Sequence, residues 1–278
     1  MSTENNTVFT RENLDLYLKE LAKEYRKLSG KSTPAEIILI GGAAILERYG
    51  FRDMTTDVDA IIRAASSMKE AANRVRDRFD LPVGWLNADF MQTDSYTPKL
   101  IEHAVYYKTY SNVVTIRTVA AEYLIAMKLR SLRTYKHDYS DVVGIIKEQI
   151  EKKERIPIDK IQQAYQTLYE QALTPEMYNY VKSVCENDNI EDLFYQTVRS
   201  EHQNRDKLRA LEDAGVQLDE TFIQNMQIPN SGSKIEYPEE IKIEKVSDYK
   251  NGIANATQDF LKNLQEQNRK GKEKSIDD

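Results

Sequence analysis

The chain has 278 residues, of which 30% are charged and one is cysteine, and its net charge is −6. This length suits one large or two modest domains, and no apolar run approaches the roughly 20 residues of a membrane span. The acidic balance argues against broad binding to nucleic acid while leaving room for a local basic patch, and the lone Cys185 together with an N-terminal stretch unlike a signal peptide leads us to expect a cytoplasmic protein.

The first predicted element is an amphipathic helix that begins after Thr10 and ends near Leu28. Apolar residues recur at positions 14, 18, 21, 25 and 28, which is the spacing of one helix face. Thr10 is a suitable N-cap, and Phe9 with Leu14 has the spacing of a hydrophobic staple. We expect this helix to pack over a sheet.

A strand–glycine–helix–strand pattern follows. Residues 37–40 form an apolar strand-like run that ends in Gly41-Gly42, and residues 43–49 form a short helical segment. Glycine between a strand and a helix lets backbone N–H groups approach a phosphate at the helix N-terminus. A lone Gly-Gly is usually only a turn, so the phosphate-binding interpretation depends on what the next strand carries.

That second strand, residues 55–62, carries two carboxylates. Asp57 and Asp59 point to the same face because side chains alternate along a strand. Neighbouring carboxylates repel each other, and a cation between them relieves the repulsion. Their oxygen ligands suit a hard cation such as Mg²⁺. Together with the glycines, the pair predicts a metal and phosphate site.

Residues 66–79 read as a helix with Lys and Arg on its polar side, which we interpret as a solvated face. Residues 80–100 are loop-rich and contain Asp89 and Asp94. The residues alone indicate that Asp89 is an exposed loop acid.

Two strand-like runs, 104–110 and 113–118, joined at Ser111-Asn112, indicate a hairpin. Residues 120–133 then form the strongest predicted helix, with Lys128 at the edge of its apolar face. Residues 117–137 carry five Lys or Arg against one acid, a countercharge suited to a triphosphate. A basic face that serves only solubility, or a lysine that snorkels outward, is the alternative.

A further helix is predicted from Asp138 to about residue 152, with Asp138 as its cap. Residues 157–172, 175–186 and 190–213 read as a small helical bundle, with Thr174-Pro175 as its clearest helix start. Residues 216–278 read as a linker followed by a polar, partly disordered tail.

The motifs resemble the nucleotidyltransferase superfamily with the DNA polymerase β-type fold, and within it the bacterial AbiEii-type toxins. The resemblance covers residues 10–150. It is carried by Gly41, Gly42, Tyr49, Gly50, Arg52 and Thr56-Asp57-Val58-Asp59, by residues 81–87, and by residues 124–129 with Arg133 and Asp138 to Asp141. The resemblance also implies a third carboxylate on a neighbouring strand, for which Asp89 and Asp94 are the candidates, and an exposed loop acid is an equally good interpretation of Asp89. The chain departs from the pattern at Ala88, where relatives often carry Asp, and Asp89 follows.

The resemblance implies an α/β nucleotidyltransferase domain at 1–150, with a small mixed sheet flanked by helices. The helical spacing described above adds a helical region at 151–215. It implies transfer of a nucleotidyl group from an NTP to an RNA or protein hydroxyl, with Mg²⁺ or Mn²⁺ on Asp57 and Asp59. The catalytic set would be Asp57, Asp59, Lys128 and Asp89, and the phosphate set Gly41, Gly42, Arg52, Thr56, Arg130, Arg133 and Asp138.

A role in a toxin–antitoxin or phage-defence pair, with a cognate antitoxin as partner, is also implied by the resemblance. Two alternatives stay open: a nucleotide-binding protein without turnover, which Ala88 favours, and a partner-binding protein that acts through its C-terminal helices.

Overall fold

The computed structural model describes residues 7–213. A division of the chain falls after residue 231, and all described residues lie before it. None of the described helices is both long enough and apolar enough to cross a membrane. The predicted linker and tail lie outside the described residues, and the predicted domain boundary near residue 150 stays a prediction.

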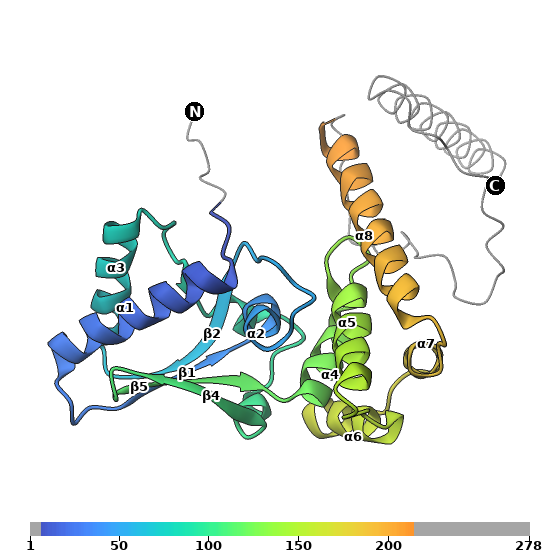
Figure 1. The fold of residues 1–278 in the computed structure, drawn as a ribbon, viewed down its shortest axis with the longest axis horizontal. Helices are drawn as coiled ribbons and strands as arrows, with labels where there is room; N and C mark the ends of the chain where they lie inside the picture. The colour runs from blue at the N-terminus through green and yellow to red at the C-terminus, as the bar shows by residue number, and fades with distance from the viewer. Residues whose placement is uncertain (1–6, 214–278) are drawn as a thin grey trace, which may run out of the picture. The chain divides into compact units, whose positions relative to one another are not determined.

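A five-stranded mixed sheet forms the first part of the structure (Figure 1). Its strands are β1 (Ala35–Leu39), β2 (Val58–Arg63), β3 (Leu86–Asn87), β4 (Ala104–Tyr110) and β5 (Val114–Val119). The spatial order is β3-β2-β1-β5-β4. The β1 strand runs antiparallel to β2 and parallel to β5, and β2 runs parallel to β3. The buried residues of β1, which lies between β2 and β5, make it the centre of the core.

Helices α1 (Arg11–Ser29) and α3 (Ser67–Phe79) pack against each other beside this sheet. Thr10 caps α1 in a capping box with Asn13, and Leu14 and Leu18 of α1 are fully buried. The short helix α2 (Gly41–Arg48) begins directly after β1. The sequence-based prediction of these helices is confirmed, with α2 starting at the glycines themselves.

The predicted hairpin between β4 and β5 is present. Ser111 and Asn112 have φ angles of 52° and 53°, so both residues adopt the left-handed conformation of a type I′ turn. Two 3₁₀ turns, η1 (Asp89–Gln92) and η2 (Pro98–Ile101), occupy the stretch predicted to be loop-rich.

Five further helices gather beyond the sheet: α4 (Ala121–Ser131), α5 (Asp138–Glu151), α6 (Ile158–Tyr169), α7 (Pro175–Cys185) and α8 (Ile190–Asp213) (Figure 1). The α4 helix packs on α5 and α6, and α8 packs on α5. The predicted class, a mixed sheet with flanking helices followed by helices, is confirmed. The predicted start of α7 is confirmed as well, since the Thr174 side chain accepts from the Met177 amide.

The loop after α2 anchors the sheet to α5. The Gly50 and Phe51 amides both donate to Oε1 of Glu148, with the Phe51 bond at 3.0 Å. The Phe51 ring lies over Gly144, where a Cβ atom would approach the ring carbons within 2.5 Å. Any larger residue at 144 would displace this ring, so Gly144 fixes the position of the loop that carries Arg52.

Candidate active site

Asp57 and Asp59 lie at the start of β2, beside the N-terminus of α2. Asp59 pairs in register with Asn87 of β3, and its carbonyl oxygen accepts from the Ile40 amide at 2.9 Å. This bond places Gly41 next to Asp59, and a Cβ atom on Gly41 would lie 3.9 Å from Oδ2 of Asp59. Gly41 has a φ of 53°, a conformation that other residues rarely adopt. The predicted carboxylate pair and glycine pair are therefore adjacent.

Unbalanced negative charge collects around Asp59. Burial raises its pKa to about 6, and the charges of Asp57 and Asp89 add to the effect. The charges of Lys128 and Lys136 act in the opposite direction. Such a carboxylate gains from a nearby cation, because the cation offsets both the desolvation and the repulsion.

These residues fit a divalent cation, with two protein carboxylates as the clear ligands. Within residues 7–213 no three His, Cys, Asp or Glu side chains converge closely enough to hold a metal ion. Asp89, an exposed residue at the start of η1, stands near the pair without completing such a group. Mg²⁺ commonly uses one or two carboxylates together with water and substrate phosphate oxygens, so the pair matches its chemistry.

Thr55, a residue that the sequence did not single out, orients Asp57. It is 3% exposed, forms a bridge with Phe9, and donates its hydroxyl to Oδ1 of Asp57 at 3.0 Å. Thr56, the predicted residue, is exposed. Because adjacent side chains in extended backbone point in opposite directions, only one of the two threonines can turn toward the site.

Gly42→Ala is expected to destabilise the fold by about 1–3 kcal/mol, the usual cost of overpacking. A Cβ atom at 42 would lie 2.6 Å from Oγ1 of Thr55 and 3.2 Å from Nη2 of Arg52. Urea unfolding of the single and double variants tests this packing. Adding Thr55→Ala should recover part of the loss, because it removes the closer atom, whereas strictly additive effects of the two substitutions would contradict this packing.

Lys128 is held by two buried carboxylates. Its Nζ lies 3.0 Å from Oδ1 of Asp138 and 2.7 Å from Oδ2 of Asp141. The Lys128 side chain is 13% exposed, against 0% for Asp138 and 2% for Asp141. Burial alone would lower the pKa of Lys128, but the two carboxylates outweigh it and raise that pKa. Lys128 therefore stays charged, and its charge is already matched.

An arginine extends this cluster at each end. Arg52 donates from Nη1 to both oxygens of Asp141, at 2.8 and 2.9 Å. Arg133 donates from Nε and from its backbone amide to Oδ2 of Asp138, at 2.8 and 3.0 Å. Three cations thus share two carboxylates, which leaves one positive charge in excess. We call these five residues the ion-pair cluster.

The structure excludes one interpretation of Asp138, that of a helix N-cap. The N-cap position of α5 belongs to His137, so Asp138 is not its N-cap. Although burial opposes ionisation, Lys128 and Arg133 hold the pKa of Asp138 well below its usual range. A carboxylate held in this way anchors cations and is a poor proton acceptor.

Arg130, also predicted to contact phosphate, lies elsewhere. Its Nη1 donates to Gln171 at 3.2 Å, and its guanidinium lies 5.4 Å from the ring centre of Tyr169. Tyr169 is the last residue of α6 and Gln171 lies just after it, so the structure does not bring Arg130 to the ion-pair cluster. Helical spacing explains this, because residues 128 and 130 are two apart and face different sides of α4.

Lys136 is an exposed lysine in the turn between α4 and α5. Its charge, after that of Lys128, opposes the rise in the pKa of Asp59, which places Lys136 near the carboxylate pair. No carboxylate of residues 7–213 lies within ion-pair distance of its ammonium group. Lys136 was one of the five basic residues noted at 117–137, but only the fold shows that it has no carboxylate partner among the described residues.

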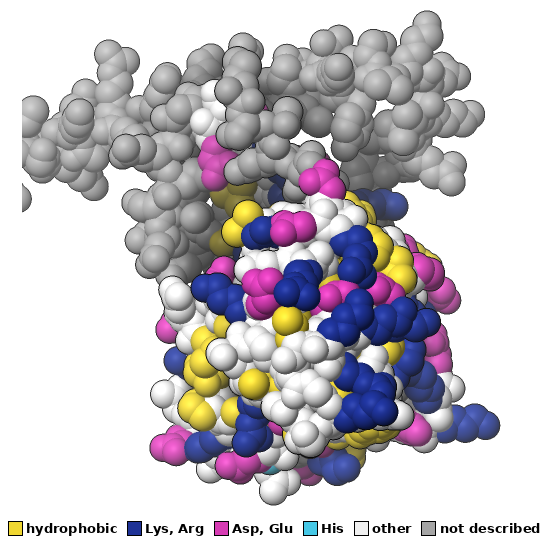
Figure 2. Space-filling view, turned by 90° about the vertical axis from the view of Figure 1, so that its left-hand side faces the viewer, with side chains coloured by type: hydrophobic (Ala, Val, Ile, Leu, Met, Phe, Trp, Pro, Cys, Tyr) yellow, Lys and Arg dark blue, Asp and Glu magenta, His cyan; other side chains and the backbone are white. Residues whose placement is uncertain are grey.

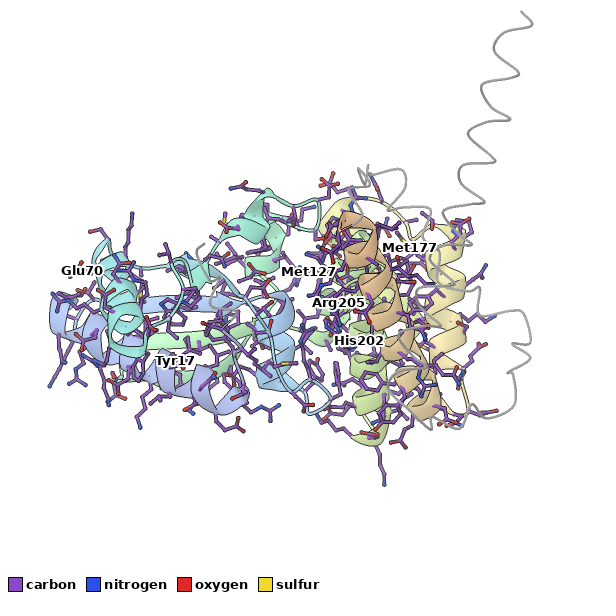
Figure 3. The ribbon with its side chains drawn as sticks, turned by 90° about the horizontal axis from the view of Figure 1, so that it is seen from above. Tyr17, Glu70, Met127, Met177, His202 and Arg205 are labelled. Carbon is purple, nitrogen blue, oxygen red and sulfur yellow. The ribbon has the colours of Figure 1, made fainter. Side chains whose placement is uncertain are left out.

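Helix α8 is hydrogen-bonded to the turn between α4 and α5 and to the start of α5. Glu201 is fully buried, and its Oε1 accepts from the Tyr139 and Ser140 amides at the start of α5. Asn204 donates to the Thr134 carbonyl at 3.1 Å. Arg205, shown beside His202 in Figure 3, donates to His202 at 2.7 Å. The first turn of α5, and with it Asp138 and Asp141, is thereby fixed by α8.

Glu201→Gln is expected to flatten the dependence of stability on pH above pH 6.5. Burial raises the pKa of Glu201 to about 8, so the folded state binds a proton that the unfolded state releases, and stability falls as pH rises toward 8. Burial lowers the pKa of His137 to about 4, so His137 has the opposite effect below pH 6.5 and offsets Glu201 there. Urea unfolding at pH 6.5 and 8 measures the difference, and an equal slope in both proteins would contradict the assignment.

One family model matches the chain, over residues 17–194, and its description reads nucleotidyltransferase of unknown function (DUF6036). The match spans β1 to β5 and helices α2 to α7, including both aspartates and the ion-pair cluster. No curated protein and no solved structure matches the chain.

Proposed function

The chain belongs to this family of nucleotidyltransferases, and from that premise we propose that it transfers a nucleotidyl group from an NTP to a hydroxyl group of RNA or protein. The observation that carries the proposal is the placement of Asp57 and Asp59 against Gly41-Gly42, with basic side chains across from them. Carboxylates that hold a cation and amides that hold phosphate are the two parts that phosphoryl chemistry requires.

In the proposed reaction the acceptor oxygen forms a bond to the α-phosphorus, and the bond from that phosphorus to the bridging oxygen of the β-phosphate breaks. Pyrophosphate leaves with the bond electrons. When bound, Mg²⁺ (or Mn²⁺) would neutralise charge on the phosphate oxygens and bring the reactants together. Asp57 and Asp59 would hold it, and the amides at the start of α2 would hold phosphate oxygens. Asp89, exposed beside the pair, is the candidate acceptor for the hydroxyl proton.

Among the basic residues, Lys136 is the one proposed to contact the triphosphate directly. The ion-pair cluster carries one positive charge in excess, and we propose that this charge attracts the same phosphates through Arg52 and Arg133. Lys128 acts indirectly, since both of its carboxylate partners are buried.

Lys136→Met is expected to weaken NTP binding about tenfold, because one charge-assisted phosphate contact contributes about 1.5 kcal/mol. Isothermal titration calorimetry with Mg²⁺ and each NTP measures the change. Lys99→Met is the matched control, since Lys99 pairs with Glu170 on the surface. Equal affinities for wild type and Lys136→Met would remove Lys136 from the proposed site.

A second candidate function is nucleotide binding without turnover, and the lack of three converging carboxylates in the described part of the chain favours it. Incubation with labelled ATP, GTP, CTP and UTP, Mg²⁺ or Mn²⁺, total RNA and lysate separates the two. Label on RNA or protein supports transfer. Binding without any labelled product supports the second candidate, and absence of NTP binding contradicts both.

The resemblance to AbiEii-type toxins supports a further proposal, that the chain is the toxin of a toxin–antitoxin or phage-defence pair. Induced expression should then arrest growth, and Asp57→Asn with Asp59→Asn should relieve the arrest. Unimpaired growth at high expression would count against a toxin role without bearing on transfer in vitro.

A further inference from the structure

We propose that the outer surface formed by α1 and α3 binds the phosphate backbone of a nucleic acid. Residues 19–31 and α3, residues 67–79, together contain nine Lys and Arg against four Asp and Glu, a net charge of +5 in a chain of net charge −6. These two segments pack against each other. Figure 2 looks onto this end of the molecule, where Lys and Arg side chains gather. We call this surface the basic face.

Its acidic residues are already matched by cations within the basic face. Glu24, which is 2% exposed, accepts from Lys27 at 2.8 Å and from Arg78 at 2.7 Å. These hydrogen bonds lower the pKa of Glu24 to about 2. Glu20 accepts from Lys23 at 2.6 Å and again from Arg78 at 2.9 Å. Because one arginine bridges both carboxylates, the remaining cations are left in excess and the face stays positive.

A hollow of about 380 Å³ marks the α1 end of the basic face. It is lined by Lys23, Arg26, Lys27, Lys31 and Ser111. Arg26 donates to the Ser111 carbonyl at 3.0 Å, which ties the β4–β5 turn to α1. Within residues 7–213 no carboxylate pairs with Lys31. Three lysines therefore line the hollow, and the hydrogen bond from Arg26 to Ser111 fixes one of its sides.

The basic face is distinct from the proposed active site. Ala35 at the start of β1 pairs with Val114, directly after the β4–β5 turn, whereas Leu39 at the other end of β1 precedes Gly41. The two regions thus lie at opposite ends of the same strand. A ligand on the basic face would occupy a surface that the transfer chemistry does not use, so the inference is independent of the proposed function.

The composition of the face favours nucleic acid over an acidic protein. None of the large apolar side chains exposed in residues 7–213 belongs to residues 19–31 or 67–79. Protein–protein interfaces place apolar and aromatic residues at their centre, whereas nucleic-acid interfaces are more polar and strongly positive. Long lysine and arginine side chains on two packed helices match a repeating line of phosphates.

Fluorescence anisotropy with the full chain and labelled 25-nucleotide single-stranded RNA and DNA tests the inference, without NTP and over a series of NaCl concentrations. Lys23→Gln, Lys27→Gln and Lys31→Gln together should weaken binding at least tenfold. The slope of log affinity against log salt should become shallower by about 2, since each lost single-strand contact contributes about 0.7. The matched control is Lys153→Gln, Lys160→Gln and Lys182→Gln, which changes net charge equally on exposed lysines elsewhere.

The inference holds if the first triple variant loses affinity and the control keeps it within about twofold. It is overturned if wild type binds neither oligonucleotide at low salt, or if both triple variants lose affinity equally. Polyglutamate of matched charge that competes as well as the oligonucleotide would overturn the assignment to nucleic acid. Thermal unfolding of each variant confirms that the comparison is between folded proteins. Because no NTP is present, failure here leaves the transfer assay untouched.

Discussion

Replacing Asp57 and Asp59 together by asparagine is expected to reduce nucleotidyl transfer by about a thousandfold, since a bound metal ion contributes several kcal/mol to the transition state and each 1.36 kcal/mol is tenfold in rate. The fold should persist. Asp57 is exposed, and the raised pKa of Asp59 means that its charged form is disfavoured in the folded protein. A neutral isostere removes that repulsion, so the thermal midpoint should stay constant or rise.

Labelled-NTP transfer and differential scanning calorimetry on the same preparation measure the two effects. Asp80→Asn with Asp188→Asn is a matched control, because both are exposed acids that belong to neither the carboxylate pair nor the ion-pair cluster. A lowered thermal midpoint in the Asp57 and Asp59 variant would show that the pair is structural. Unchanged transfer would show that the chemistry lies elsewhere.

Most elements of this fold were predictable because their signals are local, but the two-residue strand β3 lies in a stretch predicted to be loop. The Thr10 cap, the Ser111-Asn112 turn and the apolar spacing of α1 each depend on residues within a few positions of one another. The adjacency of the two glycines and the two aspartates was predictable for the same reason, since both belong to the consecutive elements β1, α2 and β2. Element ends shifted by one to three residues, as at β2, which begins at Val58.

The rest of the site depends on contacts between distant residues, and these leave no periodic trace in the sequence. Glu201 reaches the α5 amides across about 60 positions of chain. The choice between Thr55 and Thr56 follows from pairing with Phe9. Lys128 looked like a free cation because its partners, Asp138 and Asp141, lie on the next helix. A basic run shows how much positive charge is present, and the fold decides which part of it is unpaired.

Lys128→Met is expected to lower the free energy of unfolding by about 3 kcal/mol, the lower end of the cost of breaking a buried ion pair. Methionine keeps much of the stem volume, but Asp138 and Asp141 would lose their shared cation while 0% and 2% exposed. The cost stays at the lower end because Arg133 still holds Asp138 and Arg52 still holds Asp141. Urea unfolding at pH 7 measures the loss.

Lys147→Met is the matched control for that experiment. Lys147 pairs with Glu151, which is 55% exposed, at 2.9 Å in an i,i+4 geometry, and such surface pairs contribute about 0–1 kcal/mol. Equal destabilisation by the two substitutions would show that Lys128 is no more than a surface lysine. A loss confined to Lys128→Met, together with weaker NTP binding, would show that Lys128 supports the phosphate site by bridging Asp138 and Asp141 and thereby fixing Arg52 and Arg133.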